Sequence, residues 1–220
     1  MSQVTQDKQR QEGFTILELM IATTVFSLVL MVCLAGIMQI TRMYYQGVTQ
    51  VRTQEVSRAL IDEIGESIRF SKDPIAGPFV DSGASADPDV QHICIGRKRY
   101  TYALDRQLSQ NPDAANEQKR HVLWVDQPGG ACTSSADLDA EDPSGGLGGD
   151  ELIAENMRLS AFEITELSNV DQLYRINVTV VFGDTDLIEK SDTPVTCKSS
   201  FVGSEFCAVA TSTLIVGRRL

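Results

Sequence analysis

Residues 13–40, which read GFTILELMIATTVFSLVLMVCLAGIMQI, decide the fold of this chain. After Glu18 the stretch carries no charged side chain until Arg42. As a helix, Leu19–Ile40 would measure about 33 Å at a rise of about 1.5 Å per residue. That length crosses the hydrocarbon core of a bilayer, which is about 30 Å thick. Because the apolar residues surround the whole helix, the stretch predicts a membrane-spanning segment rather than a soluble amphipathic helix.

One charged residue, Glu18, lies about one turn inside this apolar run. A carboxylate is costly in lipid, so an acid inside a membrane helix is by default a functional residue with a partner. Cleavage of the peptide bond after Gly13 would leave a free cationic amine on Phe14, at the head of the helix. The amine of a neighbouring copy would then neutralise Glu18 when such helices lie side by side.

This stretch resembles the class III signal of type IV prepilins and type II secretion pseudopilins, which reads Gly, Phe, Thr, two apolar residues, Glu and a long apolar run. Residues 13–18 and the run that follows meet that pattern. The resemblance implies that a prepilin peptidase cleaves after Gly13 and methylates the amine of Phe14, and that Glu18 guides assembly with other pilin subunits. It also implies a single-pass protein of the inner or cytoplasmic membrane whose body lies outside the cytoplasm, in a periplasmic or extracellular filament after assembly. The alternative is an ordinary membrane anchor with a stray acid.

The same interpretation divides the chain into a leader (1–13), a transmembrane assembly helix (14–40), an amphipathic helix (41–72) and an exported β-rich domain (73–220). One helix is expected from residue 14 to about residue 71, ended by Pro74. Its second half carries apolar residues at three- and four-residue steps, which predict one stripe that a sheet would cover: Val48, Val51, Val56, Leu60, Ile61, Ile64 and Ile68. The predicted fold class is α+β, with a helical spine packed on a mainly antiparallel, pilin-like sheet.

Alternation of apolar and polar residues predicts the strands of that sheet, and small or polar residues predict its loops. The strands are expected at residues 92–96, 99–104, 120–126, 157–167, 173–182 and 206–216. Loops are expected at residues 74–90, 105–119 and 128–150. The last of these is rich in Gly, Ser, Asp and Pro, and we expect it to be exposed and mobile except where Cys132 pins it.

Cysteine usage agrees with export. Cys33 lies in the anchor and is expected to be a buried thiol. The other four cysteines all lie in the exported part, and an even number in an oxidising compartment indicates two disulfides: Cys94, Cys132, Cys197 and Cys207. Three pairings are possible. The pairing of Cys94 with Cys132 and of Cys197 with Cys207 is favoured, because the second closes a short C-terminal loop that resembles the one in many pilins.

Metal binding and catalysis receive little support from the sequence. A zinc site is disfavoured, because the cysteines form no CxxC pair and neither His92 nor His121 clusters with them in sequence. The acidic residues Asp137, Asp139 and Asp142 are weak calcium candidates, and a plain solvated loop is the preferred interpretation. The chain has 2 histidines, so no nucleophile–His grouping is supported and an enzyme is not expected.

Composition bounds the remaining choices. The chain has 220 residues with 42% hydrophobic and 22% charged residues, which is normal for a globular domain, and a net charge of −11, which disfavours whole-surface binding of nucleic acid.

Major pilins usually carry a proline partway along the helix, whereas here none precedes Pro74, so the resemblance favours a minor pilin or J-type pseudopilin at or near the tip. The alternative is a tip adhesin or a DNA-uptake subunit. A basic patch would favour DNA, formed by Arg97, Lys98, Arg99 and Arg106, or by Arg218 and Arg219.

Overall fold

The computed structural model describes residues 14–80, 90–109, 118–130, 132, 134–168, 172–189, 195–198 and 203–219. The chain divides into two compact units, Met1–Tyr44 and Tyr45–Leu220. The helix α1 (Ile16–Phe70) supplies the described part of the first unit and continues into the second, which confirms the single long helix expected from the sequence. The leader, residues 1–13, lies outside the described residues, and the finer domain boundaries stay predictions.

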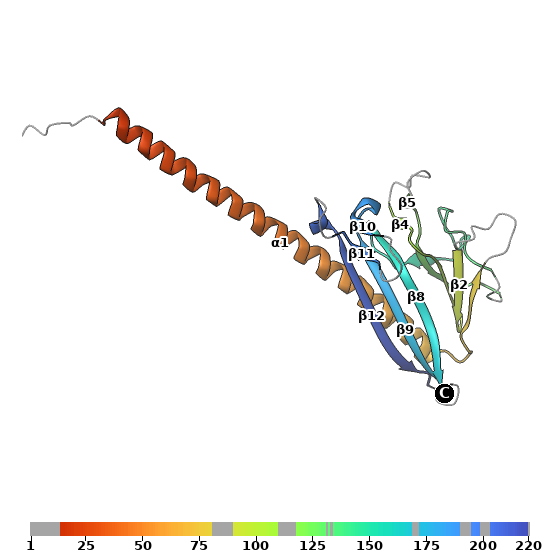
Figure 1. Cartoon of the computed structure of the whole chain (residues 1–220). Coiled ribbons are helices and arrows are strands. Elements are labelled where there is room, and N and C mark those ends of the chain that lie inside the picture. Colours follow the sequence, from red (N-terminus) through yellow and green to blue (C-terminus); the bar gives the residue numbers. More distant parts are fainter. Residues whose placement is uncertain are drawn as a thin grey trace, which may run out of the picture. The chain divides into compact units, whose positions relative to one another are not determined.

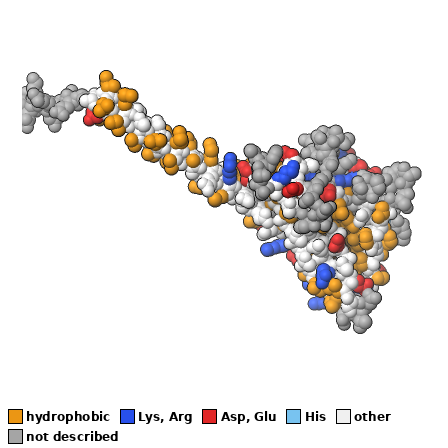
Figure 2. All heavy atoms as spheres, in the orientation of Figure 1, with side chains coloured by type: hydrophobic (Ala, Val, Ile, Leu, Met, Phe, Trp, Pro, Cys, Tyr) orange, Lys and Arg blue, Asp and Glu red, His pale blue; other side chains and the backbone are white. Residues whose placement is uncertain are grey.

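The described part of the first unit is a helix whose residues are all exposed in the single chain (Figure 2). Cys33, which we expected to be buried, is exposed here. Its sequence neighbours are apolar, so this surface must be covered by lipid or by other helices before the thiol can be buried. The expectation for Cys33 is therefore wrong for the isolated chain.

The second unit contains two five-stranded sheets and one two-stranded sheet among the described residues (Figure 1). Sheet A has the order β1 (Ala76–Val80), β2 (Val90–Ile95), β3 (Lys98–Ala103), β6 (Leu123–Asp126) and β7 (Gly149–Glu151). Sheet B has the order β12 (Ala208–Gly217), β9 (Leu173–Phe182), β8 (Met157–Ser168), β4 (Gln107–Leu108) and β5 (Gln118–Lys119). The small sheet pairs β10 (Ile188–Glu189) with β11 (Thr196–Cys197), and short 3-10 helices form at η1 (Thr185–Leu187) and η2 (Ser204–Phe206). The pairings are antiparallel except for that of β4 with β5, so the predicted α+β class with a mainly antiparallel sheet is confirmed.

The C-terminal half of α1 packs against both large sheets. Leu60, Ile61, Ile64 and Ile68 join one hydrophobic cluster with residues from β2, β3, β6, β8, β9 and β12. A Cβ built on Gly65 would come within 2.7 Å of Leu214 Cδ2, so the absence of a side chain there lets the helix approach β12 closely. The stripe from Leu60 onward is therefore buried as predicted.

The first part of the predicted stripe is wrong. Val48 and Val51 are exposed, and the face of α1 that turns toward β12 instead buries Thr49, Thr53 and Ser57. The Ser57 hydroxyl donates a hydrogen bond to Ser212 Oγ over 2.8 Å, and the Thr53 hydroxyl donates to the Thr49 carbonyl over 2.7 Å. Small residues that satisfy their own hydroxyls allow a closer helix–sheet contact than valines would, and this outweighs the apolar pattern.

The loop at residues 128–150 also differs from its prediction. Within it, Ala136 and Leu138 are 4% and 2% exposed, and they pack on the outer face of sheet A against Val90, Ala103 and Trp124. Sheet A is thus covered on both faces, by α1 on one side and by this loop on the other. The expectation of an exposed loop holds for most of its described residues, and it is wrong for Ala136 and Leu138 because they find a hydrophobic surface that the neighbouring strands provide.

Two other predicted loops contain short strands. Residues 74–90 include β1, an edge strand that pairs with β2 alone in sheet A. Gly77 and Pro78 suggested a loop, but an edge strand tolerates proline because one side of its backbone needs no partner. Residues 105–119 include the two-residue strands β4 and β5. The remaining strand predictions are confirmed within a few residues, although β6 begins at Leu123 rather than at residue 120.

Candidate functional site

The start of α1 is built by two residues that bond to each other. The backbone N–H and the hydroxyl of Thr15 donate hydrogen bonds to Glu18 Oε2 over 3.0 and 2.9 Å. The backbone N–H of Glu18 in turn donates to Thr15 Oγ1 over 3.3 Å. This is a capping box, in which an N-cap Thr and an acid three residues later satisfy donors that the first helical turn leaves unpaired. The pattern Thr-x-x-Glu at residues 15–18 is the sequence signal that predicts such a cap.

Glu18 therefore has a local partner before any other subunit arrives. Both bonds that its carboxylate accepts end on the same oxygen, Oε2. The side chain of Phe14, next to the predicted new N-terminus, is 88% exposed. Gly13, the predicted cleavage residue, lies outside the described residues. The geometry leaves Glu18 accessible on the helix surface, so a neighbouring cationic group can approach it.

The rest of the N-terminal segment suits an apolar environment. Among the described residues, α1 is the single helix long and apolar enough to cross a membrane. Its hydroxyl side chains donate to carbonyls of the preceding turn, as with Thr24 to Met20 over 2.7 Å and Ser27 to Thr23 over 2.8 Å. Polar groups that pair within their own helix avoid the cost of an unsatisfied donor in lipid. The segment thus fits a single-pass membrane anchor that carries one acid, Glu18.

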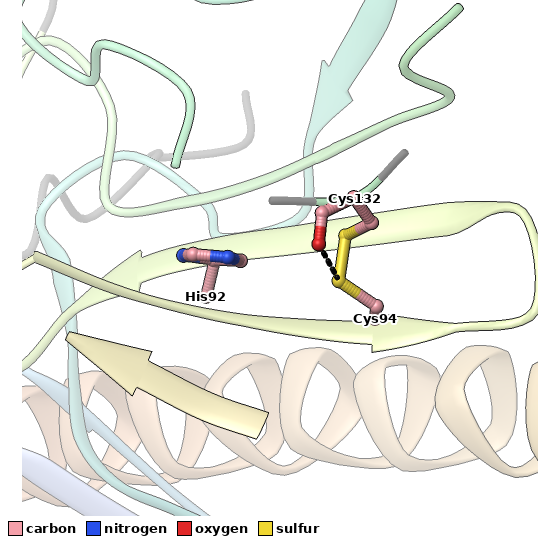
Figure 3. Close-up of side chains that lie close together, drawn as sticks. All are labelled: His92, Cys94 and Cys132. Atoms are coloured by element: carbon pink, nitrogen blue, oxygen red, sulfur yellow. Dashed lines mark hydrogen bonds between the residues drawn. A yellow bond between two sulfur atoms is a disulfide. The ribbon is translucent and has the colours of Figure 1, made fainter. Parts of the chain in front are cut away.

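Four cysteines of the second unit form two disulfides. Cys94 is joined to Cys132 and Cys197 to Cys207, with Cα atoms 6.2 and 5.8 Å apart. These are the two pairings favoured from the sequence. The first connects β2 to the loop on the outer face of sheet A (Figure 3). The second connects β11 to the residue that precedes β12, where Leu187 and Ile188 pack around it.

His92 lies beside the first disulfide (Figure 3). One ligand atom from each of His92, Cys94 and Cys132 lies within 4.8 Å of the other two. His92 and Cys94 are two residues apart in β2, so their side chains point to the same face of the sheet. From the sequence, a zinc site is disfavoured because neither histidine clusters with the cysteines, but in the structure His92 does lie beside two of them. The alternation rule could have placed His92 next to Cys94, but Cys132 joins them only through the fold.

A buried ion pair holds the same face together. Arg99, which lies opposite Cys94 in the β2–β3 register, donates to Asp126 through Nε over 2.9 Å and also through Nη2. Its Nη1 donates to the Ser134 carbonyl over 2.7 Å, two residues beyond Cys132. The backbone N–H of Ala136 donates to Thr101 Oγ1 over 3.0 Å. The loop is therefore pinned at several points besides its disulfide.

The three calcium candidates do not come together. The Asp137 carboxylate accepts the backbone N–H of Asp139, and Asp139 lies 3.5 Å from Arg106. Asp142 instead accepts the Ser144 hydroxyl and the N–H groups of Ser144 and Gly146, and these bonds, the hydroxyl first, lower the pKa of its carboxyl. Among the described residues, the one group of three side chains arranged for a metal is His92, Cys94 and Cys132. Calcium binding by Asp137, Asp139 and Asp142 receives no support from this arrangement.

The basic residues proposed as a DNA-binding patch have mostly other roles. Arg99 and Arg106 are buried and face Asp126 and Asp139. Lys98 forms an ion pair with Glu63 of α1 over 2.5 Å. Arg218 donates to the side chain of Gln172 over 2.7 Å. Lys98, Arg99 and Arg106 neutralise acids of their own chain and so contribute little positive potential to the surface, and the geometry does not favour DNA binding at the first of the two patches.

Comparison with known proteins gives one match. Residues 8–34 match the family model described as the prokaryotic N-terminal methylation motif. No curated protein and no solved structure matches the chain. The match covers the predicted cleavage residue, Phe14, Glu18 and most of the apolar segment 14–40, and the motif indicates a structural subunit rather than an enzyme. The chain therefore carries the N-terminal methylation motif, a type IV prepilin-like signal, which together with its long helix on antiparallel sheets is consistent with the pilin and pseudopilin family.

Proposed function

We propose that this chain is a minor pilin or pseudopilin, a subunit that joins a type IV pilus or a type II secretion pseudopilus at or near its tip. The observation that carries the proposal is Glu18, an acid near the start of a fully exposed apolar helix and inside a matched methylation motif. An acid at this position has no use in a plain anchor, because lipid penalises it. In a filament, by contrast, pairing of this acid with the amine of a neighbouring subunit can set the register of adjacent helices.

The proposed pathway begins in the membrane. A prepilin peptidase cleaves after Gly13 and methylates the amine of Phe14. The helix then leaves lipid for a core of neighbouring helices, one apolar environment for another, so the transfer itself changes the free energy little. The Glu18 carboxylate accepts a hydrogen bond from the cationic amine of an adjacent subunit, while Thr15 keeps the carboxylate oriented along the helix. The polar contact thus sets register, and the apolar surface supplies packing.

The proposed position near the tip is supported by the form of the helix and the body. α1 runs from Ile16 to Phe70 as one α-helix, without the proline that usually interrupts the spine of major subunits. The body carries two large sheets and a disulfide-pinned loop over the outer face of one of them. A bulk subunit must repeat its contacts along the whole filament, whereas a tip subunit can carry a large irregular body.

The N-terminal mass of the chain isolated from its own membranes tests this proposal. We expect a chain that begins at N-methylated Phe14 in wild type, and an uncleaved chain in Gly13→Ala. As a matched control, Gly36→Ala changes a glycine in the same helix and should be cleaved normally, since nothing lies within 4 Å of its Cβ position. An intact Met1 in a cell that contains prepilin peptidase would refute processing and leave a plain membrane-anchored protein.

A further inference from the structure

We propose that, before the Cys94–Cys132 disulfide forms, His92, Cys94 and Cys132 bind a zinc ion. This inference goes beyond the proposed function and holds whether or not the chain enters a filament. It rests on the cluster in Figure 3, where a histidine and two cysteines from β2 and the loop meet on one buried face. The second disulfide offers no comparable group among the described residues.

The residue types suit zinc better than other cations. Two thiolates and one imidazole are ligands of borderline softness, which favour Zn²⁺ over the hard cations Ca²⁺ and Mg²⁺. Three protein ligands leave one coordination position for water, as in catalytic rather than structural zinc sites. Cysteine must bind as thiolate, and Zn²⁺ binding releases the thiol protons.

The distances permit coordination without rebuilding the fold. Around one Zn²⁺, with Zn–S about 2.3 Å and Zn–N about 2.0 Å, tetrahedral ligand atoms lie about 3.5–3.8 Å apart. The three ligand atoms here already lie within 4.8 Å of one another, while the cysteine Cα atoms are 6.2 Å apart. Opening the disulfide would let the two sulfur atoms separate by the small amount that a metal between them requires.

The loop keeps Cys132 near the strand when the disulfide is absent. Arg99 Nη1 bonds the Ser134 carbonyl, the Ala136 N–H bonds Thr101 Oγ1, and Leu138 is buried beneath the same loop. None of these contacts depends on the covalent bond. His92 is 2% and Cys94 5% exposed, while Cys132 is half-buried, so two of the three ligands are shielded from bulk water.

The chemistry balances in both directions. In a newly made chain both cysteines are thiols, and Zn²⁺ binding releases their two protons. In the purified protein, a phosphine reductant and one water convert the disulfide into two thiols and a phosphine oxide. In an oxidising compartment, exchange with a partner disulfide reduces that partner to a dithiol and oxidises Cys94 and Cys132 to their own disulfide, which removes both thiolate ligands and would release the metal.

The test uses the full chain in detergent, with Cys33→Ser to remove the remaining thiol. After phosphine reduction, we expect one Zn²⁺ per chain by calorimetry, and Co²⁺ should give the absorption of a thiolate-bound tetrahedral ion. The oxidised chain should bind none. Cys197→Ser with Cys207→Ser is the matched control and should keep the site, whereas Cys94→Ser with Cys132→Ser should lose it. Failure of the reduced control variant to bind Zn²⁺ would overturn the proposal.

The histidine is tested separately. Loss of an outer-shell partner typically costs about 10–100-fold in metal affinity, and loss of a ligand should cost at least as much, so His92→Gln should bind Zn²⁺ about tenfold more weakly or worse. His92→Cys should restore binding and add a third thiolate to the Co²⁺ spectrum, which separates ligation from a folding defect. Equal Zn²⁺ affinity in wild type and His92→Gln would overturn the three-ligand site.

Discussion

Thr15 and Glu18 bond reciprocally at the start of α1, so that the acid proposed to recognise a neighbour also caps its own helix. The two roles are compatible because the bonds from Thr15 reach one carboxylate oxygen and Glu18 stays on an exposed surface. The capping bond orders the carboxylate in the first turn. A neighbouring amine therefore meets a group whose direction is already set.

Replacing Glu18 should separate processing from assembly. We expect Glu18→Ala to be cleaved after Gly13 but to enter filaments poorly, because the neighbouring amine loses its anionic partner. Glu18→Gln is the matched control for size: it keeps the local hydrogen bonds but not the charge, and should fail in the same way. The measurement is the amount of this subunit in sheared filaments relative to membranes. Wild-type incorporation of both variants would contradict the pairing.

Asp126→Ala should strongly lower the free energy of unfolding of the body. Its side chain is fully buried against Arg99, and an unpaired buried charge typically costs about 3–5 kcal/mol. The matched control is Glu63→Ala, which breaks the ion pair to Lys98, whose side chain is 36% exposed, and should cost about 0–1 kcal/mol. Thermal unfolding of the full chain in detergent measures both. A similar loss of stability in the two variants would show that Arg99, without Asp126, forms hydrogen bonds with another group or with water.

Adding one methyl group at Gly149 should strain sheet A. A Cβ there would lie 2.6 Å from Trp124 Nε1 and 2.7 Å from the Val125 carbonyl oxygen, and neither the indole nor the backbone can move easily. We expect Gly149→Ala to lower the free energy of unfolding by about 1–3 kcal/mol, the usual cost of overpacking.

The control for this substitution is Gly130→Ala, whose Cβ would meet nothing within 4 Å. It should change stability by no more than about 0.5 kcal/mol. Both variants can be compared by denaturant unfolding followed through Trp124 fluorescence, since the chain has 1 tryptophan. A Gly149→Ala chain as stable as Gly130→Ala would mean that the contact between β6 and β7 is looser than described.

The body should lose stability at alkaline pH through Tyr102. Burial, with a smaller contribution from the Glu163 carboxylate, raises the pKa of Tyr102 to about 12. In the unfolded chain a tyrosine titrates near about 10. Between these values the unfolded chain loses the proton while the folded one keeps it, so the stabilisation is complete below about pH 10 and declines as the pH rises toward 12.

Tyr102→Phe should therefore flatten this alkaline decline. The variant also loses the hydrogen bond to Gln91 Oε1, which measures 2.8 Å, so a small loss of stability at pH 7 is expected as well. Melting temperatures of both proteins across pH 8–12 give the comparison. An alkaline decline of the same steepness in the two proteins would rule out Tyr102 as a contributor. Tyr100, whose pKa burial also raises, would account for what remains of the slope.

The α1 residues that face the sheets show where sequence patterns succeed and fail. From Leu60 to Ile68 the apolar positions are also the buried ones, because the sheets there offer a hydrophobic surface. One to three turns earlier, the valines and the small hydroxyl residues both recur at helical spacing, so either set could face the sheet. β12 presents Ser212 to that side, and Ser57 rather than Val51 matches it. A helical pattern alone cannot identify the partner surface.

The sequence by itself determined the elements whose causes are local: the long helix, the apolar segment with its one acid, the alternating strands, and the even set of cysteines beyond the helix. Only the tertiary structure decided which groups meet across long separations. It buried the loop around Leu138 on sheet A, paired Arg99 with Asp126, and brought Cys132 to His92 and Cys94. The physical reason is that helix and strand patterns depend on neighbours a few residues apart. Contacts between distant segments depend instead on surfaces that exist only after the sheets have formed.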